Sequence, residues 1–92
     1  MGFLSKLFGS ANKYDDAKLV SHAMAAIKSD PLITNPDGLV VTSDKGVVTI
    51  SGVVARRQEK ERIEGVVRTA LTTIGLKQER IINDLKLPAG AG

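Results

Sequence analysis

The sequence contains no cysteine and no tryptophan, and its only aromatic residues are two phenylalanines and one tyrosine. Without cysteine, the chain can form neither disulfides nor thiolate metal sites. No apolar run approaches the roughly 20 residues that a membrane-spanning helix needs. The N-terminus has no secretory signal pattern, and Lys6 stands where a myristoylation motif has Ser or Thr. We therefore expect a cytoplasmic protein that can still lie peripherally on a membrane.

The composition indicates one small globular domain. Of the 92 residues, 42% are hydrophobic and 25% are charged, which is typical of a folded chain. Thirteen basic and ten acidic residues give a net charge of +3 and are well mixed along the chain. Such a mild excess is compatible with an anionic surface as partner and gives little support for nucleic-acid binding.

Residues 39–54 have the pattern of a β-hairpin, because two β-branched runs flank the tripeptide Asp44-Lys45-Gly46. Gly46 suits a three-residue loop with a bulge, which requires positive φ. Alternation predicts that one face packs on a core through Leu39, Val41, Val48, Ile50 and Val54. The opposite face carries Val40, Thr42, Val47, Thr49, Ser51 and Val53. Its three valines, Val40, Val47 and Val53, are candidates for a partner-binding patch.

Two amphipathic helices are predicted around the hairpin. The first covers 15–28, where apolar residues recur at a spacing of three to four, and Pro31 follows its end. In the loop 29–38, both Leu32 and Ile33 are expected to point inward. The second helix covers 56–74 and is closed by Gly75. Its predicted buried stripe consists of Ile63, Val66, Val67, Ala70, Leu71 and Ile74.

A third strand is predicted over 81–87, which completes the order α-β-β-α-β. The connection through the second helix is a crossover, so the last two strands should be parallel if they are neighbours. We predict an α+β fold with a small three-stranded mixed sheet, the second strand central and both helices on one face. The chain then divides into an N-terminal segment 1–14, a domain 15–87 and a flexible tail or linker 88–92.

The N-terminal segment 1–14 is unusually apolar, because residues Phe3, Leu4, Leu7 and Phe8 would form one stripe of a helix. Three interpretations remain open: an anchor at a membrane or partner, docking on the protein's own surface, and fraying of the terminus. An anchor would use Phe3, Leu4, Lys6, Leu7 and Phe8 as contact residues.

Few side chains suggest chemistry. His22 is the only histidine and lacks a ligand pattern, so we expect it at a surface or boundary. Ser43 and Ser51 have no candidate base, and we predict no catalytic residue. Arg56, Arg57 and Lys60 cluster at the start of the second helix. Their cluster indicates either a solvated face or a site for a lipid headgroup.

Three segments together resemble the BON domain of bacterial envelope and stress proteins. They are DDAKLVSHAMAAIKSDPL (15–32), GLVVTSDKGVVTISGVV (38–54) and INDLKL (82–87), so the resemblance covers about residues 15–87. The sequence departs from the family pattern after Gly75-Leu76, where the loop before the third strand is two residues longer.

The resemblance implies a non-catalytic module that associates with phospholipid surfaces or envelope partners. The segments MGFLSKLFG, KYDDAKLV and RQEKERI are also similar to small cytoplasmic potassium-binding proteins that join a BON domain to a LysM domain. No LysM sequence follows here, and the segment Leu87-Pro-Ala-Gly-Ala-Gly is where one would have been lost or cut away. Main-chain carbonyls, which leave no side-chain signature, would hold potassium, so the turns at 34–38 and 43–46 are the places to look.

We therefore expect a non-enzymatic binding module that acts at an anionic membrane surface or on a protein partner in an envelope or stress context. The alternatives are a soluble potassium-binding protein and a structural adaptor in a larger assembly. No other cofactor is expected, and the oligomeric state is left open.

Overall fold

The computed structural model describes residues 13–88 of the chain. Its elements follow the order α2 (Asp16–Ser29), η1 (Pro36–Gly38), β1 (Val40–Asp44), β2 (Val47–Val53), α3 (Arg57–Thr73) and β3 (Arg80–Lys86). The predicted N-terminal contact residues, Phe3, Leu4, Lys6, Leu7 and Phe8, lie outside the described residues.

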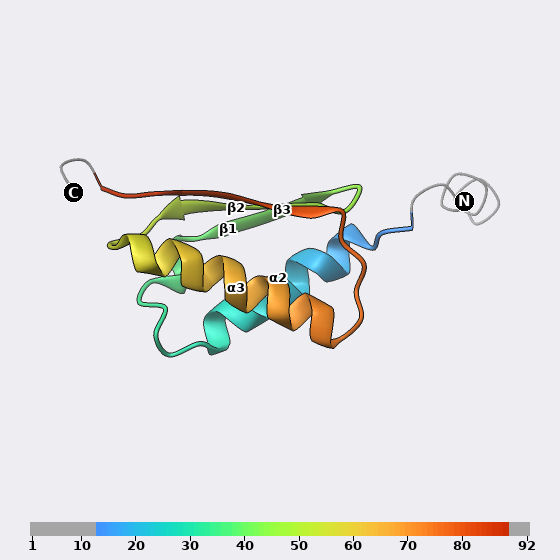
Figure 1. Cartoon of the computed structure of the whole chain (residues 1–92), viewed down its shortest axis with the longest axis horizontal. Helices are drawn as coiled ribbons and strands as arrows, with labels where there is room; N and C mark the ends of the chain where they lie inside the picture. The colour runs from blue at the N-terminus through green and yellow to red at the C-terminus, as the bar shows by residue number, and fades with distance from the viewer. Residues whose placement is uncertain (1–12, 89–92) are drawn as a thin grey trace.

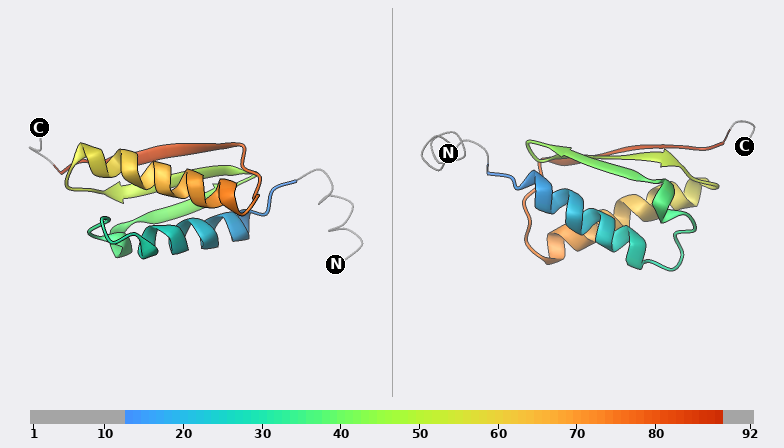
Figure 2. Two further views of the ribbon diagram at one scale, coloured as in Figure 1. Left: turned by 60° about the horizontal axis from the view of Figure 1, so that its bottom comes forward. Right: turned by 180° about the vertical axis from the view of Figure 1, so that it is seen from behind.

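The three strands form one mixed sheet with β2 in the centre, antiparallel to β1 and parallel to β3. Both helices lie on the same face of this sheet, and the other face is left open (Figure 1). The two views of Figure 2 show α2 beneath β1 and α3 beneath the other half of the sheet. The predicted α+β fold, with its α-β-β-α-β order and parallel crossover, is thereby confirmed.

The core lies between the sheet and the two helices. Val48 and Ile50 of β2 are fully buried, which confirms the predicted register of the hairpin. They pack in one cluster with three fully buried residues from each helix, Leu19, Ala23, Ile27, Ile63, Val67 and Leu71. Burial of each large aliphatic side chain contributes about 1.5–3 kcal/mol, so this cluster supplies most of the stabilisation of the domain.

The hairpin turn is tighter than predicted. Asp44 pairs directly with Val47, so only Lys45 and Gly46 connect the strands, and the expected three-residue loop with a bulge is wrong. Both connecting residues have positive φ, 51° at Lys45 and 84° at Gly46. Positive φ at both central positions is the requirement of a type I′ turn, whose twist matches that of the flanking strands.

Helix α3 ends one residue earlier than predicted, and Ile74 is 49% exposed instead of buried. The cause is the helix cap: the Leu76 N–H donates to the Leu71 carbonyl at 3.0 Å, and the Gly75 N–H donates to the Thr72 carbonyl at 3.1 Å. This pair of bonds is a Schellman motif, which turns the chain back at Gly75. Leu76, the residue after Gly75, is partly buried and packs against the core.

Strand β3 begins at Arg80, one residue before the predicted start, and ends at Lys86. Its core-facing side carries a polar residue at the centre, Asn83. The Asn83 amide nitrogen donates to the Lys60 carbonyl at 2.9 Å and to the Glu64 carboxylate at 3.0 Å. The bond from Asn83 to the Glu64 carboxylate holds the pKa of Glu64 below its usual value, and the neighbouring Arg68 guanidinium adds to this effect.

Candidate binding surface at the start of helix α3

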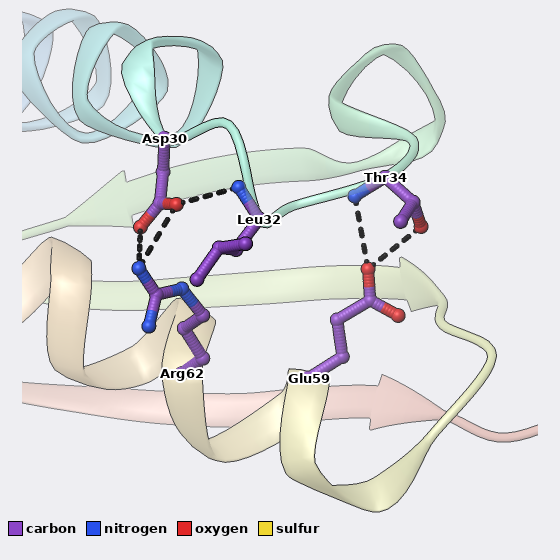
Figure 3. A network of polar contacts seen from close by, with 5 residues as sticks. All are labelled: Asp30, Leu32, Thr34, Glu59 and Arg62. Atoms are coloured by element: carbon purple, nitrogen blue, oxygen red, sulfur yellow. Dashed lines mark hydrogen bonds and ion pairs between the residues drawn. The ribbon is translucent and has the colours of Figure 1, made fainter.

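Glu59, in the first turn of α3, fastens the loop before β1 to this helix. Its carboxylate accepts hydrogen bonds from the Thr34 N–H at 3.0 Å and from the Thr34 hydroxyl at 2.8 Å (Figure 3). It also reaches back to the Ala55 N–H at 3.3 Å, much as the acidic residue of a capping box does. The two bonds from Thr34 are the main reason that the pKa of Glu59 is lowered.

A second carboxylate, that of Asp30, anchors the same loop. It accepts a bond from the Leu32 N–H at 2.9 Å and forms an ion pair with Arg62 at 3.0 Å (Figure 3). The Leu32 N–H and then Arg62 lower the pKa of Asp30. Residues 30–34 are thus held against α3 at two points, which gives this loop a defined shape.

Leu32 lies between the two anchors and points outward, with 62% of its surface exposed. The prediction that it tucks inward is wrong, whereas Ile33 is buried as predicted, at 5% exposure. Asp30 fixes the main chain of both residues, because its side chain bonds to the Leu32 N–H and its carbonyl accepts from the Ile33 N–H at 3.2 Å. Because the Ile33 side chain points into the core, the side chain of its neighbour Leu32 points toward the solvent.

The exposed leucine lines a surface hollow of about 530 Å³. The wall combines apolar, hydroxyl, amide, carboxylate and guanidinium groups and consists of Leu32, Thr34, Ala55, Arg56, Gln58, Glu59 and Arg62. A smaller hollow of about 190 Å³ shares Thr34, Ala55 and Glu59 with it and extends to Val53. This end of the molecule therefore presents apolar surface on both sides of the Glu59–Thr34 contact.

Arg56 occupies the N-cap position of α3, where residues with a short side-chain acceptor are normally preferred. Arg57 follows it, so two positive charges stand at the positive end of the helix dipole, which is locally unfavourable. Within residues 13–88, neither guanidinium takes part in an ion pair. These two cations are thus available to an anionic partner.

The predicted basic cluster is only partly brought together at the hollow. Arg56 lines it, and Arg62, which the sequence analysis did not select, lines it as well. Arg57 and Lys60 are not among the lining residues. Lys60 instead lies on the side of α3 next to β3, where its carbonyl accepts from Asn83.

The three valines predicted as a sheet-face patch are not contiguous. Val40 pairs with Ser51, two residues from Val53, and these two valines are 54% and 55% exposed. Val47 pairs with Asp44 at the hairpin turn, four residues from Ser51 along β2, or about 13 Å at the rise of a strand. Val40 and Val53 therefore lie toward the end of the sheet where α3 begins, and Val47 lies toward the other end.

The described chain begins at Lys13, and this beginning lies at the end of the molecule opposite the start of α3 (Figure 1). Tyr14, which the sequence analysis assigned to the N-terminal segment, lies against the hairpin turn: a Cβ on Gly46 would come within 2.5 Å of its ring. Its hydroxyl donates to the Glu79 carboxylate. This bond raises the pKa of Tyr14.

The two turns considered for potassium have carbonyls engaged within the protein. The Gly46 carbonyl accepts from the Glu79 N–H at 2.7 Å, and the Asn35 and Pro36 carbonyls accept from Gly38 and Leu39, both at 3.2 Å. Among residues 13–88, no group of three or more His, Asp or Glu side chains could hold a metal ion. In the same part of the chain, no helix is long and apolar enough to span a bilayer.

Sequence reasoning missed Leu32, Glu59 and Arg62 as residues of this surface. Glu59 had a detectable signal, since an acidic residue three positions after a helix start suggests a reach-back cap. The Asp30–Arg62 contact joins residues 32 positions apart, and local patterns carry no information on such a pair.

The fold defines a small α+β module, and the hollow described above lies at the end where α3 begins. The BON domain model matches residues 15–74, and the chain belongs to this family. BON domains are binding modules rather than catalytic domains. The match ends at the close of α3, so β3 lies beyond it although β3 completes the sheet. A comparison with curated proteins found no match.

Proposed function

We propose that this BON domain is a non-enzymatic module that binds the surface of an anionic phospholipid membrane through the end at which α3 begins. The observation that carries the proposal is the position of Leu32, an exposed apolar side chain that shares a hollow with Arg56 and Arg62. An apolar side chain among cations matches the chemistry of an anionic bilayer, whose phosphates lie directly above hydrocarbon.

The energetics favour a reversible contact. Insertion of one leucine-sized side chain contributes about 1.5–3 kcal/mol, and each basic residue near an anionic surface adds about 1 kcal/mol. Arg56 and Arg57 have no ion pair with residues 13–88 to give up on binding. Arg62 is paired with Asp30 and holds the loop, so we assign it a positioning role.

The local structure supports a binding role for the two arginines. Positive charge at the start of a helix opposes the helix dipole, and an arginine at the N-cap gives no side-chain cap to α3. Within residues 13–88, the charge of Arg56 is offset only in part, by the nearby Glu59 carboxylate, and Arg57 has no ion pair. Residue choices that disfavour the isolated fold in this way are typical of functional positions. An anionic headgroup would supply further compensation.

The test is cosedimentation of the full chain with vesicles of phosphatidylglycerol and phosphatidylcholine, and with phosphatidylcholine vesicles alone. We expect binding to the anionic vesicles only, weakened by salt. Leu32→Asp and Arg56→Glu should each lower the partition coefficient by about tenfold or more. Since Leu32 is exposed, its substitution should leave the melting temperature unchanged.

Ile74→Asp is the matched control, because Ile74 is also an exposed aliphatic residue but stands at the other end of α3. It should bind vesicles as the unmodified chain does. Equal binding by the Leu32, Arg56 and Ile74 variants, or no binding by the unmodified chain, would reject the proposed surface.

A further inference from the structure

Strand β3 forms one edge of the sheet, and its outer side pairs with no other described strand (Figure 2). Two contacts fix which main-chain groups point outward. The Lys86 carbonyl accepts from the Val54 N–H at 2.9 Å, and the Arg80 N–H donates to the Gly46 carbonyl at 3.4 Å. Successive residues of a strand direct their N–H and C=O groups to alternate sides. Even-numbered residues of β3 therefore face β2, and Ile81, Asn83 and Leu85 face outward.

One of the outward main-chain groups, the Leu85 N–H, is already hydrogen-bonded within the chain. The Asn83 side-chain oxygen accepts from the Leu85 N–H at 3.2 Å, while the amide nitrogen of the same side chain is held by α3. The outward N–H and C=O groups of Ile81 and Asn83 remain on the edge. A row of such groups is a template for pairing with a further strand.

The side chains on the open face of β3 form a self-complementary series. The open face of β3 presents three exposed side chains at a spacing of two along the strand. In order they are positive, apolar and negative: Arg80, Ile82 and Asp84. If two copies pair antiparallel about a two-fold axis at Ile82, Arg80 of each lies opposite Asp84 of the other. Opposite charges in this position stabilise a strand pair, whereas like charges destabilise it.

The hydrogen-bonding groups favour the same register. An axis at Ile82 places Ile81 of one copy opposite Asn83 of the other, and these are the residues whose main-chain groups face outward. An axis at Asn83 would set Arg80 opposite Lys86, and an axis at Asp84 would set two aspartates against each other. The other edge strand, β1, presents Val40, Thr42 and Asp44 on its open face and has no basic residue there to pair with Asp44.

We propose that the outer edge of β3 binds the same edge of a second copy, antiparallel and with the two-fold axis at Ile82. The two three-stranded sheets then become one continuous sheet with all helices on one face. Asp84 is bonded to Lys86 in the single chain, but both side chains are more than half exposed, so this pair is weak and Asp84 is accessible to Arg80 of the second copy. The proposal does not depend on membrane binding.

The first test is sedimentation equilibrium of the full chain up to about 1 mM, within the range of weak association. We expect a monomer–dimer equilibrium. Arg80→Asp and Asp84→Arg, each alone, should raise the dissociation constant by about tenfold or more, because each creates two like-charge pairs across the axis. The double variant Arg80→Asp/Asp84→Arg restores opposite charges and should dimerise again. Lys18→Glu, on α2, changes the charge elsewhere and should have no effect.

The second test uses the absence of cysteine from the sequence. Residues on the axis form a non-hydrogen-bonded pair with Cα atoms about 4.5 Å apart, a separation that a disulfide can bridge. Ile82→Cys should therefore oxidise to a covalent dimer, and Thr42→Cys, at the corresponding place on β1, should not. A monomer at every concentration, no rescue by the double variant, or preferential cross-linking through Thr42→Cys would overturn the proposal.

Discussion

The carboxylate of Asp16 accepts a hydrogen bond from the Gly46 N–H at 2.9 Å, across 30 positions of sequence. The same carboxylate accepts from the Lys45 N–H at 2.8 Å and from the Ser43 hydroxyl at 2.6 Å. It therefore caps the hairpin turn from the first turn of α2. The bond from Ser43, followed by the bond from Gly46, holds the pKa of Asp16 below its usual value.

This arrangement predicts a domain that is destabilised by acid. Four carboxyl groups have a folded-state pKa below the usual value, namely Asp16, Asp30, Glu59 and Glu64. The unfolded chain binds protons more readily at these groups, so the stabilisation is complete above the ordinary carboxyl pKa of about 4. It is lost as the pH falls through the lower folded-state values. Urea unfolding between pH 7 and pH 3 should show the free energy of unfolding falling over the acidic part of this range.

Asp16→Asn gives a specific version of this test. It should lower stability at pH 7 and flatten the decline toward pH 3, because an amide cannot accept all three bonds and does not titrate. Asp37→Asn is the control, since the Asp37 side chain makes no hydrogen bond with residues 13–88. An equal effect of both substitutions would show that the Asp16 contacts do not stabilise the turn.

The hairpin register predicts opposite outcomes at two adjacent residues. Ile50 is fully buried, so Ile50→Ala should cost about 2–5 kcal/mol and largely unfold so small a domain. Thr49 lies on the open face, and Thr49→Ala should change stability by less than about 0.5 kcal/mol. Denaturant melts measure both values, and the reverse order would contradict the register.

Much of the fold could be predicted because it is encoded locally. The period-two alternation around Ile50 and the helical spacing of Leu19, Ile27 and Ile63 each mark a buried face, and the crossover rule then makes β3 parallel to β2. The errors at Ile74 and Leu32 have one physical cause. Each follows a point where the chain leaves a regular element, and there main-chain hydrogen bonds, not periodicity, decide which side chain points inward.

The candidate surface was less predictable than the fold. Arg56 and Arg57 could be selected as a charge cluster, but the exposed leucine beside them could not. Its position depends on the Asp30 contacts with Leu32 and Arg62, which tertiary packing creates. The buried face of a helix or strand recurs at a regular spacing in the sequence and can be predicted from it. A surface site formed by distant segments has no such regular spacing.

The potassium hypothesis makes a separate thermodynamic prediction. If the chain binds potassium as the resemblance implies, K⁺ should raise the melting temperature more than Na⁺ at equal ionic strength, because a ligand of the native state stabilises it. Thermal melts and NMR amide shifts in matched chloride salts measure this difference. Identical melts and spectra in the two salts would reject a potassium site.

The N-terminal segment provides a further prediction about membrane attachment. Phe3, Leu4, Leu7 and Phe8 can each contribute about 1.5–3 kcal/mol if they enter a bilayer. If this segment, rather than the start of α3, is the anchor, deletion of residues 1–10 should sharply reduce cosedimentation with anionic vesicles and leave the melting temperature nearly unchanged. Attachment through the start of α3 predicts instead that the shortened chain still cosediments. A large fall in the melting temperature would instead show that the segment docks on its own domain.

The most direct measurement of the proposed function is NMR of the isotope-labelled chain titrated with anionic nanodiscs that carry a paramagnetic lipid. The amide signals of Leu32, Ala55 and Arg56 should broaden first, since these residues face the bilayer in the proposed orientation. The signals of Lys45 and Ile74, at the opposite end of the molecule, should keep their intensity. Broadening that is strongest at Lys45 and Ile74, or equal at both ends, would contradict a membrane contact through the start of α3.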